Sequence, residues 1–172
     1  MGGGTVAVAD DEEFREFMRS RWPGLVRLGY SLTGDWGMAE DLAQSALAKA
    51  YSYWSKVRQA QDPDAYVRRI LVNANHGRFR RRRVAEHSVE VLPEVGVEDE
   101  SATVEERSRL VAALQQLPPK QRSVVILRYC EDLSESQVAA VLGCSVGNVK
   151  SQASRALARL RASGDLAEGS LR

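Results

Sequence analysis

The fold is decided by residues 134–161, which read SESQVAAVLGCSVGNVKSQASRALARLR. The Ser-x-x-Gln pattern that begins at Ser134 has the form of a capping box, and the apolar run after it predicts a short helix. Gly143 predicts the end of that helix, and Ser145 is a suitable N-cap for a second helix over residues 146–161. Two helices joined by so tight a turn predict a helix-turn-helix motif.

The second helix of this motif has two faces of opposite character. One face is apolar and can be buried, whereas the other carries amide and cationic side chains that cannot all be buried. In a helix-turn-helix the second helix lies in the major groove, where Asn and Gln suit adenine and Lys or Arg suits guanine. An ordinary helical hairpin with a solvated charged face is the alternative. The candidate contact residues are Ser145, Asn148, Lys150, Ser151, Gln152 and Arg155.

The charge of the chain is small in total but strongly patterned. The formal net charge is +1 over 172 residues. Residues 1–83 hold 14 basic and 10 acidic side chains, residues 84–106 hold 8 acidic and no basic ones, and residues 107–163 hold 9 basic and 3 acidic ones. Two basic modules joined by an acidic segment are compatible with nucleic-acid binding, although the total alone argues against it.

Helical periodicity upstream of this motif predicts an all-α protein, and no strand alternation is found. A first helix is expected over residues 11–32 with a kink or break near Trp22, because Pro23 and Gly24 interrupt it. After a turn, Asp35 is a suitable N-cap for a second helix over residues 36–57.

A third helix is expected to begin at Asp62 and Pro63, because aspartate at the cap and proline at the first helical position are a strong start signal. It should extend to Arg83 or slightly beyond. Residues 86–103 fit no helical period and are rich in acids, which predicts a flexible linker. Downstream of it, helices are expected over residues 104–117 and 120–129, separated by two prolines.

These boundaries give two small helical domains joined by a flexible acidic linker. We call residues 11–85 the first module and residues 104–163 the second module. The remaining segments are a disordered N-terminus (residues 1–10), the acidic linker (residues 86–103) and a tail (residues 164–172).

A basic run at the end of the third predicted helix is a second candidate site. Its arginines repel one another in an isolated fold, but they become favourable beside phosphates, where counterion release drives binding. Two asparagines one to two turns earlier could hold an exposed base edge. A solvated tail is the alternative interpretation. The candidate residues are Asn73, Asn75, Arg78, Arg80, Arg81 and Arg82.

A compact acidic and amide patch forms a third candidate site on the second predicted helix. Glu40 and Gln44 share one face, Asp41 lies beside them and Leu42 is an apolar neighbour. A solvated helix face is the ordinary interpretation of this patch. A docking surface for a basic helical partner is the sharper alternative.

The sequence gives no support for catalysis or for metal binding. We find no nucleophile, base and acid set, no phosphate-binding glycine loop and no paired metal ligands, so no enzyme activity, cofactor or metal is expected. The two cysteines, Cys130 and Cys144, lie at no metal-ligand spacing from either histidine. No signal peptide or apolar run of transmembrane length is present, which predicts a cytoplasmic protein without a membrane or small-molecule partner.

Several segments together resemble the sigma-70 class of RNA polymerase sigma factors, in the extracytoplasmic-function group and its SigE-like actinobacterial family. The resemblance covers about residues 14–161, with its motifs in the family's order and spacing. The segments that carry it are GDWGMAEDLAQ (residues 34–44), DPDAYVRRILVN (residues 62–73), LPPKQR (residues 117–122) and VGNVKS through SRAL (residues 146–157).

This resemblance implies a role for each candidate site. Glu40, Asp41, Leu42 and Gln44 would bind the clamp helices of the largest subunit of core RNA polymerase. The arginines and asparagines of the third helix would hold melted single-stranded DNA at the −10 element. The helix-turn-helix would read the duplex −35 element beside the flap region of the polymerase. An anti-sigma factor is a further possible partner.

Two other functions are left open by the residues alone. A stand-alone helix-turn-helix repressor accounts for residues 134–161 but not for the first module or the acidic linker. An adaptor that binds a protein without DNA leaves the basic run and the cationic face of the last helix unexplained. Tight binding of the free protein to duplex DNA would favour the repressor, and weak binding would favour the sigma factor.

Overall fold

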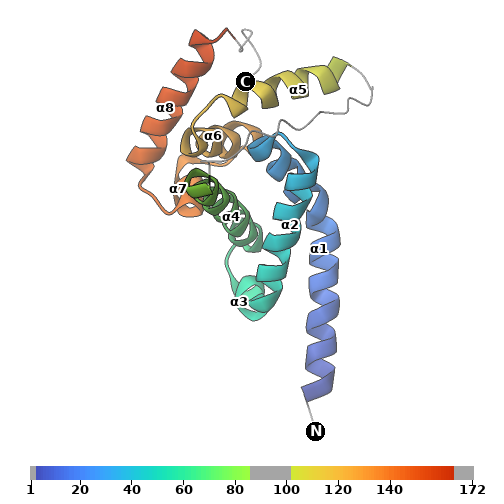
Figure 1. Ribbon diagram of the computed structural model, residues 1–172. Helices are drawn as coiled ribbons and strands as arrows, with labels where there is room; N and C mark the ends of the chain where they lie inside the picture. The colour runs from blue at the N-terminus through green and yellow to red at the C-terminus, as the bar shows by residue number, and fades with distance from the viewer. Residues whose placement is uncertain (1–2, 86–101, 165–172) are drawn as a thin grey trace.

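The computed structural model describes residues 3–85 and 102–164, and every regular element in these ranges is helical, as predicted (Figure 1). The first module holds α1 (Gly3–Thr33), α2 (Trp36–Ser52), α3 (Trp54–Gln59) and α4 (Pro63–Ala85). The second holds α5 (Ala102–Gln115), α6 (Pro119–Val125), the π-helix η1 (Ile126–Cys130), α7 (Glu135–Leu142) and α8 (Val146–Ala162). Most of the predicted acidic linker (residues 86–101) and the tail from residue 165 lie outside the described ranges.

Helix α1 runs without interruption through Pro23, so the predicted break near Trp22 is wrong. The chain is also helical from Gly3, where a disordered start was expected through residue 10. Pro23 lies on the exposed side of the helix, whereas Leu25 and Leu28 lie buried on the other side. Packing of that continuous apolar face offsets the backbone hydrogen bond that proline removes.

The second predicted helix is two helices, because the chain turns at Tyr53 between α2 and α3. The turn places Trp54 against the middle of α1, with its ring centroid 5.2 Å from that of Phe14 and 5.1 Å from that of Phe17. Arg58 of α3 pairs with Asp10 and with Glu13 of α1. Neither glycine nor proline marks this turn, so the tertiary contacts decide it.

Helix α4 begins as predicted, with Asp62 Oδ1 accepting a hydrogen bond from the Ala65 amide at 3.0 Å. It crosses the centre of the molecule, where it packs on α2 along one side and on α6 and α7 along another (Figure 1). Val67, Leu71 and Val72 are completely buried in these contacts. The position of α4 between the other helices of the first module and the second module controls which of its side chains reach solvent.

The segment expected to form one helix over residues 120–129 forms an α-helix that continues as a π-helix. After α6, η1 follows with a π-type hydrogen bond of 2.9 Å from the Glu131 amide to the Ile126 carbonyl. All residues from Gln121 to Leu127 are buried, whereas the last three residues of η1 are half-buried or exposed. Local sequence gives no signal for the wider turn of η1.

The buried apolar side chains of both modules belong to one continuous core. Leu28 and Leu32 of the first module and Leu114 and Val124 of the second are members of the same cluster. The two modules are therefore packed together rather than separated in this structure.

Among residues 3–85 and 102–164, none of the helices combines the length and the apolar character that crossing a membrane requires.

Candidate nucleic-acid interface

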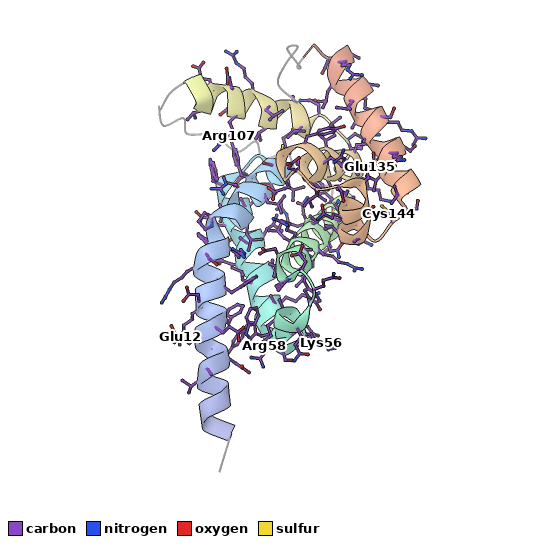
Figure 2. All side chains as sticks on the ribbon, turned by 180° about the vertical axis from the view of Figure 1, so that it is seen from behind. Glu12, Lys56, Arg58, Arg107, Glu135 and Cys144 are labelled. Atoms are coloured by element: carbon purple, nitrogen blue, oxygen red, sulfur yellow. The ribbon has the colours of Figure 1, made fainter. Side chains whose placement is uncertain are left out.

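The helices of the helix-turn-helix begin and end at the capping residues that the sequence predicted. Ser134 Oγ accepts from the Gln137 amide at 3.1 Å and Gln137 Oε1 accepts from the Ser134 amide at 2.8 Å, which completes the predicted capping box. Gly143 ends α7 in the left-handed conformation, with φ +65°. Ser145 Oγ then caps α8 by accepting from the Asn148 amide at 3.1 Å. The turn between the helices, marked by Cys144 in Figure 2, is therefore closed at the α7 end by a backbone hydrogen bond from the Cys144 amide to the Ala139 carbonyl at 3.1 Å, and at the α8 end by the Ser145 side chain.

Helix α8 buries one face and presents the other to solvent, as the amphipathic pattern predicted. Val149, Ala156 and Leu160 are buried against the rest of the second module. Of the predicted −35 residues, Ser145, Asn148, Lys150, Ser151 and Arg155 are exposed and Gln152 is half-buried. Six side chains predicted from the sequence thus lie along or beside one accessible surface, although the Ser145 oxygen is occupied as a helix cap.

The exposed face of α8 is cationic. Its helix contains Lys150, Arg155, Arg159 and Arg161 and no acidic residue. Lys150 Nζ lies 3.7 Å from Glu135 Oε2 at the start of α7, which Figure 2 labels. Both side chains are well exposed, so this ion pair contributes little and can be exchanged for a phosphate. The face suits a nucleic-acid backbone because binding there would release counterions.

Helix α4 presents only one of its three sides to solvent. Asn73, Arg80 and Arg81 of the predicted −10 set are exposed on that side. Arg78 is half-buried and its Nη2 lies 3.3 Å from Met38 Sδ of α2. Arg82 lies outside the residues whose side chains are described.

Asn75 is not presented to a ligand in this conformation, in contrast to what the sequence suggested. Its side chain is 1% exposed, and its Oδ1 has no hydrogen-bond partner among the described residues. Helical spacing places it between Leu71, on the side packed on α2, and Val72, on the side that faces the second module. A side chain so placed cannot reach a base unless the neighbouring helices move.

Tyr66 also lies on the solvent side of α4, and it was not among the site residues predicted from the sequence. It is 36% exposed and lies seven residues, about two turns, before Asn73 on the same side. Gly77 lies on this side too, and a Cβ there would meet no atom within 4 Å. The signal in the sequence was its spacing of seven residues from Asn73, which places an aromatic ring and an asparagine on the same side of a helix, and aromatic faces stack on unpaired bases.

The third candidate site is exposed except for its apolar member. Glu40, Asp41 and Gln44 face solvent on α2, whereas Leu42 is 5% exposed and belongs to the core. Leu42 is therefore not accessible to a partner in this structure, because it lies on the side of α2 that faces its neighbours. The three polar residues are the members of the predicted site that a partner could reach.

An exposed tryptophan that stacks on a half-buried tyrosine extends the same surface. Trp36 lies one turn before Glu40 and is 49% exposed. Its ring stacks on Tyr30 of α1 with a centroid distance of 3.9 Å and an interplanar angle of 4°. Half-exposed aromatics of this kind are common at the centre of protein interfaces. This stacked pair was not predicted from the sequence, because stacking across two helices is set by the tertiary structure.

Comparison with protein families identifies both modules. The family model for sigma-70 region 2 matches residues 17–84, and that for sigma-70 region 4 matches residues 107–160. The RNA polymerase sigma-E factor of Streptomyces antibioticus is 43% identical over 149 residues, which cover 87% of this chain and 83% of that protein. The sigma-E factor of Streptomyces coelicolor is 42% identical over the same length.

Solved structures agree with this similarity. The sigma factor RpoE of Bartonella quintana, determined in complex with the anti-sigma factor NepR, superposes with a TM-score of 0.71 at 28% identity, covering 88% of this chain and 96% of that chain. CnrH, determined in complex with the cytosolic domain of CnrY, gives a TM-score of 0.64 at 24% identity over 90% of this chain and 89% of that chain. The second likeness concerns the fold alone.

Proposed function

Because the chain belongs to the extracytoplasmic-function group of the sigma-70 family, we propose that its two modules read two separate promoter elements while bound to core RNA polymerase. The chain is a sigma factor that directs promoter-specific transcription initiation. It would act in the cytoplasm through binding alone, without catalysis. The observation that carries the residue assignment is the pair of exposed polar and cationic surfaces, one on α8 and one on α4.

In this proposal α8 reads the duplex −35 element. Asn148, Ser151 and Arg155 lie on its free side and would contact base edges in the major groove. Lys150 would exchange Glu135 for a phosphate, and the exposed arginines of the last turns would follow the backbone. Ser145 contributes as the cap that orients the first turn.

The solvent side of α4 would hold melted DNA at the −10 element. Tyr66 offers a ring on which a base can stack, Asn73 offers donors and acceptors to its edge, and Arg80 and Arg81 would bind phosphates. Unstacking a base costs a few kcal/mol, and these contacts offset that cost. The melted state is thereby stabilised relative to the duplex.

The exposed part of α2 would dock on the polymerase. Glu40, Asp41 and Gln44 suit the basic clamp helices of the largest subunit, and the Trp36 ring adds apolar area beside them. The second module would lie near the flap region. Since the sigma factor RpoE of Bartonella quintana is known in a complex with the anti-sigma factor NepR, we include an anti-sigma factor among the proposed partners.

Reconstituted transcription tests the proposal. Core polymerase is incubated with a genomic promoter library, with and without the protein, and transcript starts are mapped. We expect starts that depend on the protein and share two sequence motifs at a fixed spacing. Absence of such starts, despite binding to core polymerase, would overturn the proposal.

Matched substitutions then separate the two surfaces. Arg155→Ala should weaken promoter binding roughly tenfold and relax the upstream motif, because a good base contact contributes about 1–3 kcal/mol. Asn73→Ala should leave duplex binding unchanged but reduce open-complex formation, measured by permanganate reactivity of unpaired thymines. Arg161→Ala removes an exposed arginine at the end of α8 that has only a backbone role in this proposal, so it should weaken binding without relaxing the upstream motif. Equal relaxation of the motif by both arginine substitutions would contradict base reading by α8.

A further inference from the structure

Glu135 is the one acidic residue between positions 133 and 164 of the sequence, a segment that also holds four basic residues. It is the first residue of α7 and is labelled in Figure 2. Its Oε2 lies 3.7 Å from Lys150 Nζ of α8, and the two side chains are 38% and 63% exposed. A negative charge that solvent and DNA can reach therefore lies beside a surface that is otherwise suited to phosphates.

Lys150 differs from the other cations of α8 in having this partner. Within the described ranges, Arg155, Arg159 and Arg161 take part in no ion pair. Lys150 is also the cation nearest the beginning of α8, and a helix-turn-helix places the beginning of its second helix on the base edges. Glu135 thus neutralises the cation that lies closest to the groove.

Helix stability explains why an acidic residue suits the first turn of α7, but it does not explain the contact with α8. A carboxylate in the first turn of a helix interacts favourably with the helix dipole. The capping box already provides partners for the Ser134 and Gln137 amides, so α7 is capped without Glu135. The direction of the Glu135 side chain toward Lys150 is a separate property, and it is the one that bears on DNA.

The ion pair joins the two helices that would lie on the groove and on the backbone of a bound duplex. In a helix-turn-helix the second helix enters the major groove, while the first helix crosses the DNA backbone. A carboxylate repels phosphates that lie within a Debye length, which is about 8 Å at physiological ionic strength. Lys150 must also leave Glu135 before it can bind a phosphate. Both effects oppose binding of duplex DNA.

We propose that Glu135 lowers the affinity of the second module for duplex DNA, chiefly by pairing with Lys150. The inference rests on the proposed function of α8 as the helix that reads duplex DNA. A low affinity keeps the free chain from occupying genomic duplex, where non-specific sites far outnumber promoters. Core polymerase holds the chain near promoter DNA, and the resulting effective concentration compensates for the weak contact.

Binding of the free chain to a short fluorescent duplex of mixed sequence tests the proposal, with anisotropy measured over a range of KCl concentrations. Glu135→Gln keeps the size of the side chain and removes its charge. The affinity at low salt should rise roughly fivefold, the upper range for breaking an exposed ion pair. The slope of log affinity against log salt should steepen by about one, because one more cation is free to bind phosphate. Unchanged affinity and slope would overturn the proposal.

Glu106→Gln is the matched control, because it removes the same charge at an exposed position of α5. Its affinity and salt slope should stay close to those of the wild type. An equal gain in both variants would overturn the proposal, because the change in net charge alone would then explain it. Thermal unfolding of Glu135→Gln measures any loss of α7 stability, and such a loss cannot account for tighter DNA binding.

A double-substitution cycle with Lys150→Gln shows whether Glu135 acts through Lys150. Without Lys150, Glu135→Gln should raise the affinity by less than about twofold, because no ion pair is left to break. An equal gain in the two backgrounds would refute action through Lys150.

Failure of this inference can be told apart from failure of the proposed function by adding Arg155→Ala to the same binding assay. If Arg155→Ala leaves the duplex affinity unchanged, α8 does not read duplex DNA, and both the proposed function of α8 and the role of Glu135 are refuted. If Arg155→Ala weakens binding but Glu135→Gln does not strengthen it, only the role of Glu135 is refuted.

Discussion

Helices α4 and α8 have similar cationic and amide side chains, but they are available to DNA to very different degrees. Helix α8 packs by one side and leaves the opposite side free along its length. Helix α4 is covered by α2 on one side and by the second module on another, so that Asn75 is buried while Asn73 is exposed. A polar side chain on a helix is therefore evidence for a binding surface only when the neighbouring elements are known.

This difference follows from where each helix lies in the molecule. Helix α8 is at the edge of the second module, whereas α4 lies at the centre of a core that both modules share (Figure 1). The substitutions that follow weaken contacts that hold α4 and α8 in place, and they are given in order of decreasing expected loss of stability.

Arg122→Ala should have the largest effect, because it removes the donors that join the end of α1 to the second module. Four buried or half-buried carbonyls, of Leu114, Gln115, Leu117 and Leu32, would lose a charged partner. We expect a loss of about 3 kcal/mol and a melting temperature lower by about 10 °C, measured by calorimetry. Arg109→Ala, at an exposed arginine of α5, should change stability by less than about 0.5 kcal/mol. A similar melting temperature for both variants would contradict this account.

Gly29→Ala tests the packing of α2, the helix that covers one side of α4, because α2 lies close to α1 at this glycine. A Cβ at residue 29 would lie 2.9 Å from Ala39 Cα and 3.0 Å from the Ala39 carbonyl oxygen. Backbone atoms cannot move aside as a flexible side chain can, so α2 must shift. We expect about 2 kcal/mol of destabilisation in urea unfolding.

Gly24→Ala is the matched control in the same helix. A Cβ there meets only the end of the Arg27 side chain, at 4.0 Å. This substitution should stabilise the protein slightly, by about 0.5 kcal/mol, through the better helix propensity of alanine. Effects of the same sign at both glycines would argue against the close crossing of α1 and α2.

Ser134→Ala should destabilise α7, the helix against which α8 packs. The substitution removes the oxygen that accepts from the Gln137 amide and breaks the capping box. The expected loss is about 1 kcal/mol of unfolding free energy. Ser136→Ala, at an exposed serine in the same helix, should have a smaller effect, and an equal loss would show that the cap is not what stabilises α7.

The pH dependence of stability should report the contact of α4 with α6. Burial lowers the pKa of His76, and the charges of Lys120, Arg80 and Arg122 lower it further, while a backbone contact with Pro119 opposes the shift. Above the ordinary imidazole pKa of about 6.5 the residue is neutral in both states and contributes nothing. As the pH falls below this value, the unfolded chain binds the proton first, so the folded state loses stability until the lowered pKa is reached.

Urea unfolding between about pH 7.5 and about pH 5.5 would measure this effect, which we expect to be the smallest of the set. Glu131 acts in the opposite sense, because its raised pKa lets the folded state gain a proton first as the pH falls below that raised value. The comparison with His76→Gln, which keeps a donor for Ser123, isolates the histidine. An unchanged pH slope in His76→Gln would contradict the assignment.

Much of the secondary structure was predictable because its signals are local. The caps at Asp62, Ser134 and Ser145 and the left-handed Gly143 lie where the sequence indicated. The amphipathic pattern of α8 also predicted which of its sides is free. Predictions failed where packing opposed a local rule, as at Pro23 inside α1, or where no local signal exists, as at Tyr53 and in η1.

The sequence by itself determined the helical class, the helix-turn-helix and the family, because caps, periodicity and motif spacing act within a few residues of one another. Only the tertiary structure decided that Leu42 and Asn75 are buried, that Tyr66 and Trp36 are exposed, and that Arg122 joins two modules. Exposure is a property of a residue's neighbours in space. Those neighbours come from helices distant in the sequence, so no local pattern could specify them.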